Sequence, residues 1–135
     1  MEITIKTNKR EEIIDITEKI NEIVKKTKIK KGFCIVFVPH ATAAITINES
    51  YDPAIKEDFL SFLRTMVPKG KWLHDKIDNN ADAHIKSAII GSSVMIPITN
   101  SKLQLGTWQG IMFCEFDGPR ERKIILQCIE NAQQA

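Results

Sequence analysis

Residues 33–38 form the segment that most constrains the fold of this chain. They read Phe-Cys-Ile-Val-Phe-Val, with no polar side chain on either face and many β-branched and aromatic residues. Such residues favour strands, and a strand that is apolar on both faces needs other elements packed against each of them. The segment therefore predicts a central strand of a sheet that is covered on both sides.

Further strands are predicted on either side of this segment. Each is an alternating or nearly apolar run bounded by turn-forming residues. Asp117-Gly118-Pro119 predicts the turn of a hairpin that joins the last two strands. The additional predicted strands are residues 2–7, 44–49, 94–98, 107–116 and 121–129.

The first predicted helix follows a short strand within residues 12–17. Thr17 is its expected cap, and a basic run before Gly32 is its expected end. Lysines in that run favour the carbonyl end of a helix dipole, so they are read as a solvated helix end rather than a nucleic-acid surface.

Two more helices are predicted downstream. Asp52 caps the second, with Pro53 at its first position, and Asn79 or Asn80 caps the third, which ends at Gly91. Apolar side chains at helical spacing mark the faces expected to be buried. These are Ile55, Phe59, Phe62, Leu63 and Met66 on the second helix, and Ile85, Ala88 and Ile89 on the third.

This order of elements predicts one α+β domain over residues 1–135. The strands and helices do not alternate regularly as in a parallel β-α-β sheet, so we expect mainly antiparallel β-sheets in a two-layer, sandwich-like arrangement, with about three helices. A chain of 135 residues with 43% hydrophobic residues can bury a core of its own.

Composition excludes several functional classes. The net charge of +2 is too small to indicate nucleic-acid binding, and no apolar run approaches the length of a membrane helix. The alternating start does not resemble a signal peptide, so a cytoplasmic location is expected. Cys34, Cys114 and Cys128 lie in apolar runs without C-x-x-C spacing, which predicts buried free thiols.

Residues 72–86 concentrate the polar chemistry of the chain. This run contains two of the three histidines, His74 and His84, together with three aspartates and two adjacent asparagines. A packed core does not require such a run, so it is interpreted as the centre of a site. The aspartates are more simply read as a solvated loop and helix start, and Asn80 as either a cap or a substrate contact.

His40, His74 and His84 occupy strand ends or helix starts. From such positions three imidazoles could bind zinc with one position open, or transfer protons near neutral pH. Without an H-x-x-x-H motif their convergence depends on the fold, and scattered structural histidines are the alternative.

Two glutamates and two arginines form a second group of candidates. Glu49 and Glu115 end nearly apolar strands, so each carboxylate must be paired if it is buried. Arg120 and Arg122 lie just past the turn from Glu115. They predict either an internal Glu–Arg pair or a fork of two guanidinium groups for a phosphate or carboxylate ligand.

Trp108 and Gln109 are flanked by Gly106 and Gly110. The glycines permit close backbone approach, so Trp108 is a candidate wall for a planar ligand. Ordinary core packing or a subunit contact would explain it equally well.

Several blocks of the sequence, spread over about residues 32–129, together resemble one known family. They are His40-Ala41-Thr42-Ala43, Ile47-Asn48-Glu49, Ala83-His84-Ile85-Lys86, Leu105-Gly106-Thr107-Trp108-Gln109-Gly110 and Cys114-Glu115-Phe116. In this order they resemble the YjbQ-like family, also named secondary thiamine-phosphate synthase. The resemblance implies a small α+β protein that forms trimers and joins a pyrimidine methyl diphosphate to a thiazole phosphate with release of pyrophosphate.

The leading hypothesis is therefore an enzyme acting on a small phosphorylated substrate. Catalytic candidates are His40, His74, His84, Glu49 and Glu115, and ligand-binding candidates are Asn80, Lys86, Trp108, Gln109, Arg120 and Arg122. A divalent metal is possible: Zn²⁺ on the three histidines, or Mg²⁺ on Glu49, Asp82 or Glu115.

The alternatives are a homotrimeric binding protein for a small anion or metal without turnover, and a metal-dependent hydrolase. If the site lies between subunits, Trp108 comes from one chain and His40 from its neighbour.

Overall fold

β3 (Lys31–Phe37) lies in the middle of a five-stranded sheet. The computed structural model describes residues 1–132. Within them the strand order is β1-β8-β3-β5-β6 in one sheet and β2-β7-β4 in the other, and every pairing is antiparallel. The other elements are β1 (Glu2–Lys6), β2 (Glu12–Asp15), α1 (Thr17–Thr27), β4 (Ala43–Glu49), α2 (Pro53–Met66), the 3₁₀ helix η1 (Leu73–Lys76), α3 (Ala81–Ile90), β5 (Ser93–Thr99), β6 (Lys102–Leu103), β7 (Gln109–Glu115) and β8 (Glu121–Glu130).

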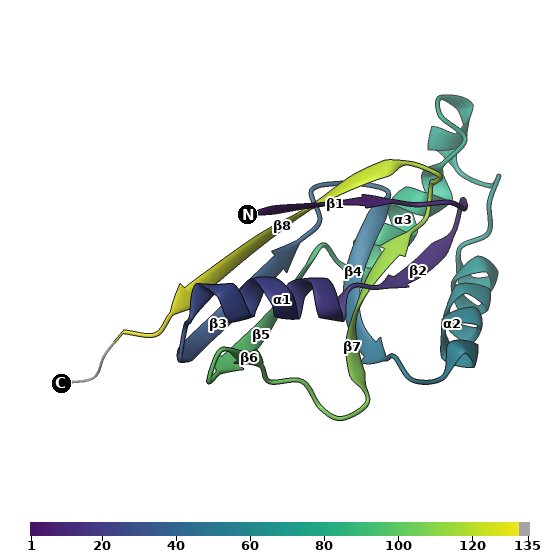
Figure 1. Cartoon of the computed structure of the whole chain (residues 1–135). Coiled ribbons are helices and arrows are strands. Elements are labelled where there is room, and N and C mark those ends of the chain that lie inside the picture. The colour runs from purple at the N-terminus through teal and green to yellow at the C-terminus, as the bar shows by residue number, and fades with distance from the viewer. Residues whose placement is uncertain (133–135) are drawn as a thin grey trace.

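The main core lies between the two sheets and α1, which crosses one face of the molecule (Figure 1). Ile20 and Val24 of α1 are fully buried there, as their helical spacing predicts. A second, smaller core joins α2 and α3 to the outer side of the three-stranded sheet. The predicted α+β, mainly antiparallel two-layer fold is thus confirmed.

The two faces of β3 differ in their cover. Cys34 and Val36 point into the core and are fully buried, whereas Phe33 and Ile35 are half-buried and Phe37 is exposed. Within one chain the expectation of cover on both faces is therefore wrong. No helix packs on the outer side of this strand in the described residues.

β7 and β8 do not form the predicted hairpin. β7 pairs with β2 and β4, while β8 pairs with β1 and β3, so the chain passes from one sheet to the other between them. The linking residues include a cis Gly118–Pro119 peptide bond. The two strands instead pair with segments far away in sequence, and the one pair of consecutive strands joined by a tight turn within residues 1–132 is β5–β6.

The caps of the first two helices follow the sequence only in part. Thr17 does not cap α1; its backbone N–H donates to the Asp15 carboxylate at 2.9 Å, and its hydroxyl accepts from Ile111 N–H. Asp52 does cap α2, because it accepts from Ala54 N–H.

The buried face of α2 is rotated from the predicted one. Phe62 and Met66, expected inside, are each 61% exposed. Leu63 is buried as predicted, and Leu60 is buried with it in the smaller core. Val67, just past the end of the helix, is buried as well.

The buried face of α3 differs most from the one that the sequence predicts. Ala88 and Ile89 of its predicted apolar face point outward and Ile85 is half-buried, while Ala81, Asp82, Ala83, Lys86 and Ser87 are buried. Its buried face is thus partly charged, which hydrophobic periodicity cannot predict.

Cys34, Cys114 and Cys128 are free thiols, as predicted. The first two are buried and the third is half-buried. Burial raises the pKa of Cys114 to about 12. Among the described residues, no helix has both the length and the hydropathy to span a membrane. Residues 131–135 have little apolar surface and were expected to form a tail, of which residues 133–135 lie outside the described part of the chain.

Candidate functional site

An open hollow of about 300 Å³ lies between the end of β3 and α3. The loop after β3 and the start of β4 supply His40, Ala41 and Ala43, and α3 supplies His84, Ser87 and Ala88. Gly91 and Ser92 complete the lining. Two of the three predicted histidines therefore face the same space, although 44 positions of sequence separate them.

His40 is held as a neutral imidazole. Its Nε2 accepts a hydrogen bond from Lys123 N–H at 2.9 Å, so the ring proton resides on Nδ1. Burial lowers the pKa of His40 below its ordinary value, and the nearby Arg122 guanidinium lowers this pKa further. An imidazole in this state can donate a hydrogen bond from Nδ1 into the hollow, because its Nε2 lone pair is already engaged.

His74 and His84 form an aromatic pair. Their ring centroids are 4.8 Å apart and the planes meet at 83°, an edge-to-face contact. His74 lies in η1. Asp75 of η1 connects this helix to α3, because the Asp75 carboxylate accepts hydrogen bonds from Trp72 N–H and from Ala81 N–H. The three histidines thus lie on adjoining elements, with His84 common to the hollow and the ring pair.

Asn80 stands at the N-cap of α3, but its side chain does not cap the helix. Asp75 satisfies the Ala81 N–H instead, and the Asn80 amide donates to Asp117 Oδ2 at 2.8 Å. Asp117 in turn pairs with Arg120. The capping explanation for Asn80 is therefore wrong, and its amide joins α3 to the crossing between β7 and β8.

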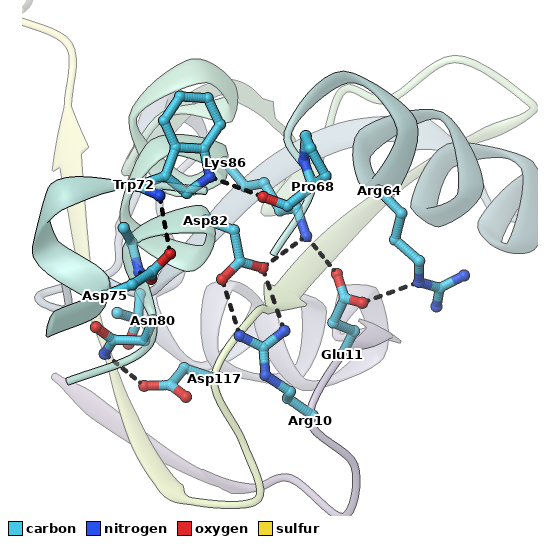
Figure 2. A network of polar contacts seen from close by, with 12 residues as sticks. Arg10, Glu11, Arg64, Pro68, Trp72, Asp75, Asn80, Asp82, Lys86 and Asp117 are labelled. Carbon is cyan, nitrogen blue, oxygen red and sulfur yellow. Dashed lines mark hydrogen bonds and ion pairs between the residues drawn. The ribbon is translucent and has the colours of Figure 1, made fainter. Parts of the chain in front are cut away.

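A charged network lies beneath α3 (Figure 2). Both guanidinium Nη atoms of Arg10 donate to the Asp82 carboxylate at 3.0 and 3.2 Å. Lys86 Nζ bridges Asp82 and Glu11, and Glu11 also accepts from Arg64. Asp82 is 0% and Lys86 1% exposed, so the expectation of a solvated Asp82 is wrong and Lys86 lies inside the protein.

Ion pairing controls the charge on Asp82. Burial alone would raise the pKa of this carboxyl, but hydrogen bonds from Arg10 and Lys86 outweigh it and hold the pKa below the usual range. A paired buried carboxylate fixes its partners in place. The network therefore anchors the helix that carries His84.

Glu115 and Arg122 form the internal pair that the sequence allowed. Both are buried, and Arg122 Nε donates to Glu115 Oε1 at 2.9 Å. Thr7 and Thr42 complete the pair: Thr7 Oγ1 donates to Glu115 and Thr42 Oγ1 accepts from Arg122. Arg120 is half-exposed and bound to Asp117, so the two arginines do not form a fork within this chain.

Glu49, Trp108 and Gln109 lie at the opposite end of the three-stranded sheet. Glu49 pairs with Gln109, whereas Ala43, which lines the hollow, pairs with Glu115. The six residue steps between these pairs correspond to about 20 Å of strand. Trp108 is 58% exposed and packs edge-on against Tyr51. One chain thus does not bring this group to the histidines.

Metal binding remains a prediction. Across residues 1–132, no group of three or more His, Cys, Asp or Glu side chains is gathered so as to hold a metal ion. His40 Nε2 is occupied by Lys123 N–H, and His74 Nε2 faces Asp78 at 3.6 Å. The donor set of a single chain therefore does not fit the predicted three-histidine zinc site.

Sequence reasoning missed Arg10, Glu11 and Ser87. Arg10 and Glu11 sit in the bend before β2, more than 70 positions from their partners Asp82 and Lys86, so no local pattern reveals them. Ser87 falls three residues after His84 and so shares its helix face, a spacing that could have identified it.

Comparison with known proteins identifies the family. The model of the UPF0047 protein YjbQ-like family matches residues 1–131. The UPF0047 protein of Methanocaldococcus jannaschii is 50% identical over 93% of this chain and 90% of its own length. The UPF0047 protein YugU of Bacillus subtilis is 45% identical over 89% and 91%, respectively.

Solved structures agree with this assignment. A YjbQ/UPF0047 family protein from Clostridium acetobutylicum has 45% identity and a TM-score of 0.92, covering 96% of this chain and 99% of that one. A YbjQ-like protein of unknown function from Sulfolobus solfataricus has 38% identity and a TM-score of 0.93, covering 97% and 96%. The chain belongs to the YjbQ/UPF0047 family.

Proposed function

We propose that this protein is an enzyme that acts on a small phosphorylated heterocycle, with the hollow between His40 and His84 as its active site. The observation that carries the proposal is that two imidazoles from distant segments face one open space, with His40 held neutral. A buried ion network and a tied turn position α3. A helix that several polar contacts hold in one orientation is typical of preorganised sites.

The reaction that we propose is thiamine-phosphate synthesis, as the family resemblance implies. The bond between the methylene carbon of the pyrimidine and its diphosphate oxygen breaks, and the diphosphate leaves with the electron pair. The thiazole nitrogen then forms the new carbon–nitrogen bond to that methylene carbon. The reaction therefore requires donors that stabilise the developing charge on the diphosphate.

The residues of the hollow suit these roles. His84 donates a hydrogen bond or a proton to the departing diphosphate, and His40 donates from Nδ1. The small side chains Ala41, Ala43 and Ala88 leave room for a flat ring between the two imidazoles.

A product assay tests this proposal. Purified protein is incubated with the pyrimidine methyl diphosphate and the thiazole phosphate, and thiamine phosphate and pyrophosphate are measured. We expect equal amounts of both products and a loss of about 10²–10⁴-fold in His84→Gln. No product from folded wild-type protein at any substrate concentration would contradict the synthase function.

We also propose that copies of this chain assemble into a homotrimer. The outer face of the five-stranded sheet carries Phe37, Met95, Ile125 and Ile129, which are 37–62% exposed. Phe37 lies opposite Ile125 and Phe33 opposite Ile129 in register, so these side chains form one continuous apolar surface. A neighbouring copy would provide the second cover that the composition of β3 predicts.

In such an assembly a neighbouring chain can complete the site. Trp108 and Tyr51 form an exposed aromatic pair about 20 Å along the sheet from the hollow of their own chain. We propose that this pair approaches the hollow of the next subunit and covers the ring of the substrate.

The three free thiols agree with a reducing, cytoplasmic location.

The metal-dependent hydrolase remains an alternative prediction. It requires ligands beyond those that one chain gathers. Elemental analysis of the purified protein, with activity measured before and after a chelator, separates it from the synthase. Stoichiometric metal together with chelator-sensitive hydrolysis would favour the hydrolase.

A further inference from the structure

Unsatisfied hydrogen-bonding groups gather around His84. Within residues 1–132, three buried side-chain nitrogen or oxygen atoms have no hydrogen-bond partner: His74 Nε2, Asn80 Oδ1 and Ser87 Oγ. Asn80 precedes His84 by four residues and Ser87 follows it by three, so both share its side of α3. His74 contacts the His84 ring directly. Folded proteins rarely leave such atoms unpaired, so their concentration at one place indicates a site for a ligand.

Ser87 is the one of these residues that lines the hollow. It is 7% exposed. A serine within a helix commonly donates to the carbonyl four residues before it, but the Ser87 hydroxyl has no partner. Alanine at this position would favour the helix more and would leave no polar atom unpaired. The hydroxyl therefore has no structural use in the chain by itself.

The groups that line the hollow around Ser87 favour the binding of an anion. The residues that line the hollow in the described part of the chain include no carboxylate. His40 carries its ring proton on Nδ1, because Nε2 accepts from Lys123. The His84 imidazole and the Ser87 hydroxyl add two further groups able to donate. Donors in a hollow whose described lining has no carboxylate suit a phosphate oxygen better than a cation.

We infer that Ser87, with His40 and His84, forms a subsite for a phosphate group, and that Ser87 donates its hydroxyl proton to a phosphate oxygen. The inference deepens the proposed function and rests on it only in naming this phosphate as part of the leaving diphosphate. Ser87 is thus a ligand-binding residue, and the unpaired hydroxyl is retained for the bound state.

Binding of inorganic pyrophosphate tests the subsite without turnover. Calorimetric titration compares wild-type protein, Ser87→Ala and Ser61→Ala, the last being an exposed serine in the middle of α2. We expect Ser87→Ala to weaken binding about 10- to 100-fold, since a hydrogen bond to a charged group is lost. Ser61→Ala should bind as the wild type does.

Thermal unfolding of the same variants without ligand gives a second readout. Removal of an unpaired buried hydroxyl should leave the melting temperature of Ser87→Ala unchanged or higher. Equal pyrophosphate affinity in Ser87→Ala and wild type, or no binding by wild type at millimolar concentration, overturns the subsite. A lowered melting temperature with unchanged affinity would show that the hydroxyl is structural, and would also overturn it.

The two proposals fail in different ways. If pyrophosphate binds and Ser87→Ala weakens it while no thiamine phosphate forms, the subsite stands and the synthase reaction fails. If the synthase reaction proceeds and Ser87→Ala leaves pyrophosphate affinity unchanged, the reaction stands and the role of Ser87 fails.

Discussion

Asp82 and Asp78 are two aspartates of one short segment with opposite surroundings. Asp82 is fully buried between Arg10 and Lys86, whereas the Asp78 side chain is 60% exposed. Asp82→Asn leaves the buried Lys86 and the partly buried Arg10 underpaired and should lower the free energy of unfolding by about 3–5 kcal/mol. Asp78→Asn should change it by less than about 0.5 kcal/mol. Urea unfolding at pH 7 measures both, and equal values would contradict the role of the network.

The lowered pKa of Asp82 also predicts a pH dependence. Its carboxylate contributes stability that is fully present above the ordinary pKa of 3.8 and is lost as the pH falls through the lower, folded-state pKa. Unfolding free energies measured from pH 5 down to pH 2 should therefore fall more steeply for wild type than for Asp82→Asn. Parallel curves would show that the pKa of Asp82 is the same in the folded and the unfolded protein, which would contradict the prediction.

The lowered pKa of His40 predicts a pH dependence of the same sign in a higher pH range. Because its folded-state pKa lies below the ordinary 6.5, the unfolded chain takes up the proton first as the pH falls. Between pH 6.5 and the folded-state pKa, acidification should therefore lower stability, and His40→Gln should remove that part of the slope. Unfolding curves at closely spaced pH values test this. A slope that is the same in His40→Gln would mean that another group is responsible.

The contacts of a single residue could be predicted from the sequence where they depend only on neighbouring residues or on the cost of burying a charge. The Asp52 cap and the internal partner of Glu115 follow from local geometry and from the cost of an unpaired buried carboxylate. The state of Asp82 and Lys86 does not, because their partners Arg10 and Glu11 lie in a distant turn. His40 and His84 were recognised as candidates, but their common hollow depends on the packing of α3 against β4.

The crossing from β7 to β8 is one of the connections that lead from one sheet to the other. A Cβ atom on Gly118 would lie 2.3 Å from Lys9 O and 2.8 Å from Thr7 Oγ1, closer than real contacts allow. Gly118→Ala should therefore destabilise the fold by about 1–3 kcal/mol or more. At Gly106 the nearest atom, 3.2 Å away, is the end of the Gln109 side chain, which can move.

Gly106→Ala is thus the matched control for this prediction. We expect a loss of less than about 1 kcal/mol, read from melting temperatures and urea midpoints of both variants. If Gly118→Ala costs no more than Gly106→Ala, the crossing is looser than its contacts with Lys9 and Thr7 indicate.

Elements were predicted better than their connections. Alternation and capping identified the long strands and α2, because these signals are local. The hairpin between β7 and β8 was wrong, because Asp117-Gly118-Pro119 signals a reversal of the chain but not which sheet the next strand joins. On α3 an apolar face was assigned to the core although charge pairs occupy the buried side.

At the scale of the whole molecule, two methionines test the assembly. Met95 on the outer face of β5 is 62% exposed and Met66 at the end of α2 is 61% exposed. If the outer face of the sheet is the trimer interface, Met95→Lys should yield monomers, because a charge would be buried among apolar residues, and Met66→Lys should not. Light scattering with size-exclusion chromatography measures the mass. A monomeric wild type would contradict the trimer.

The sequence constrained the architecture of the chain more closely than its function. Apolar runs of strand length and short polar connections require antiparallel layers around a shared core, which the structure has. The site depends on which loops meet at the ends of those layers, and this is set by contacts between residues far apart in the chain.

The central claim is that His40 and His84 face one site for a phosphorylated ligand. Nuclear magnetic resonance of the imidazole signals, assigned with His40→Gln and His84→Gln, tests it during titration with the pyrimidine methyl diphosphate. We predict that the signals of both histidines shift together along one saturating curve. Saturable binding that leaves both signals in place, or moves only one of them, would contradict the claim.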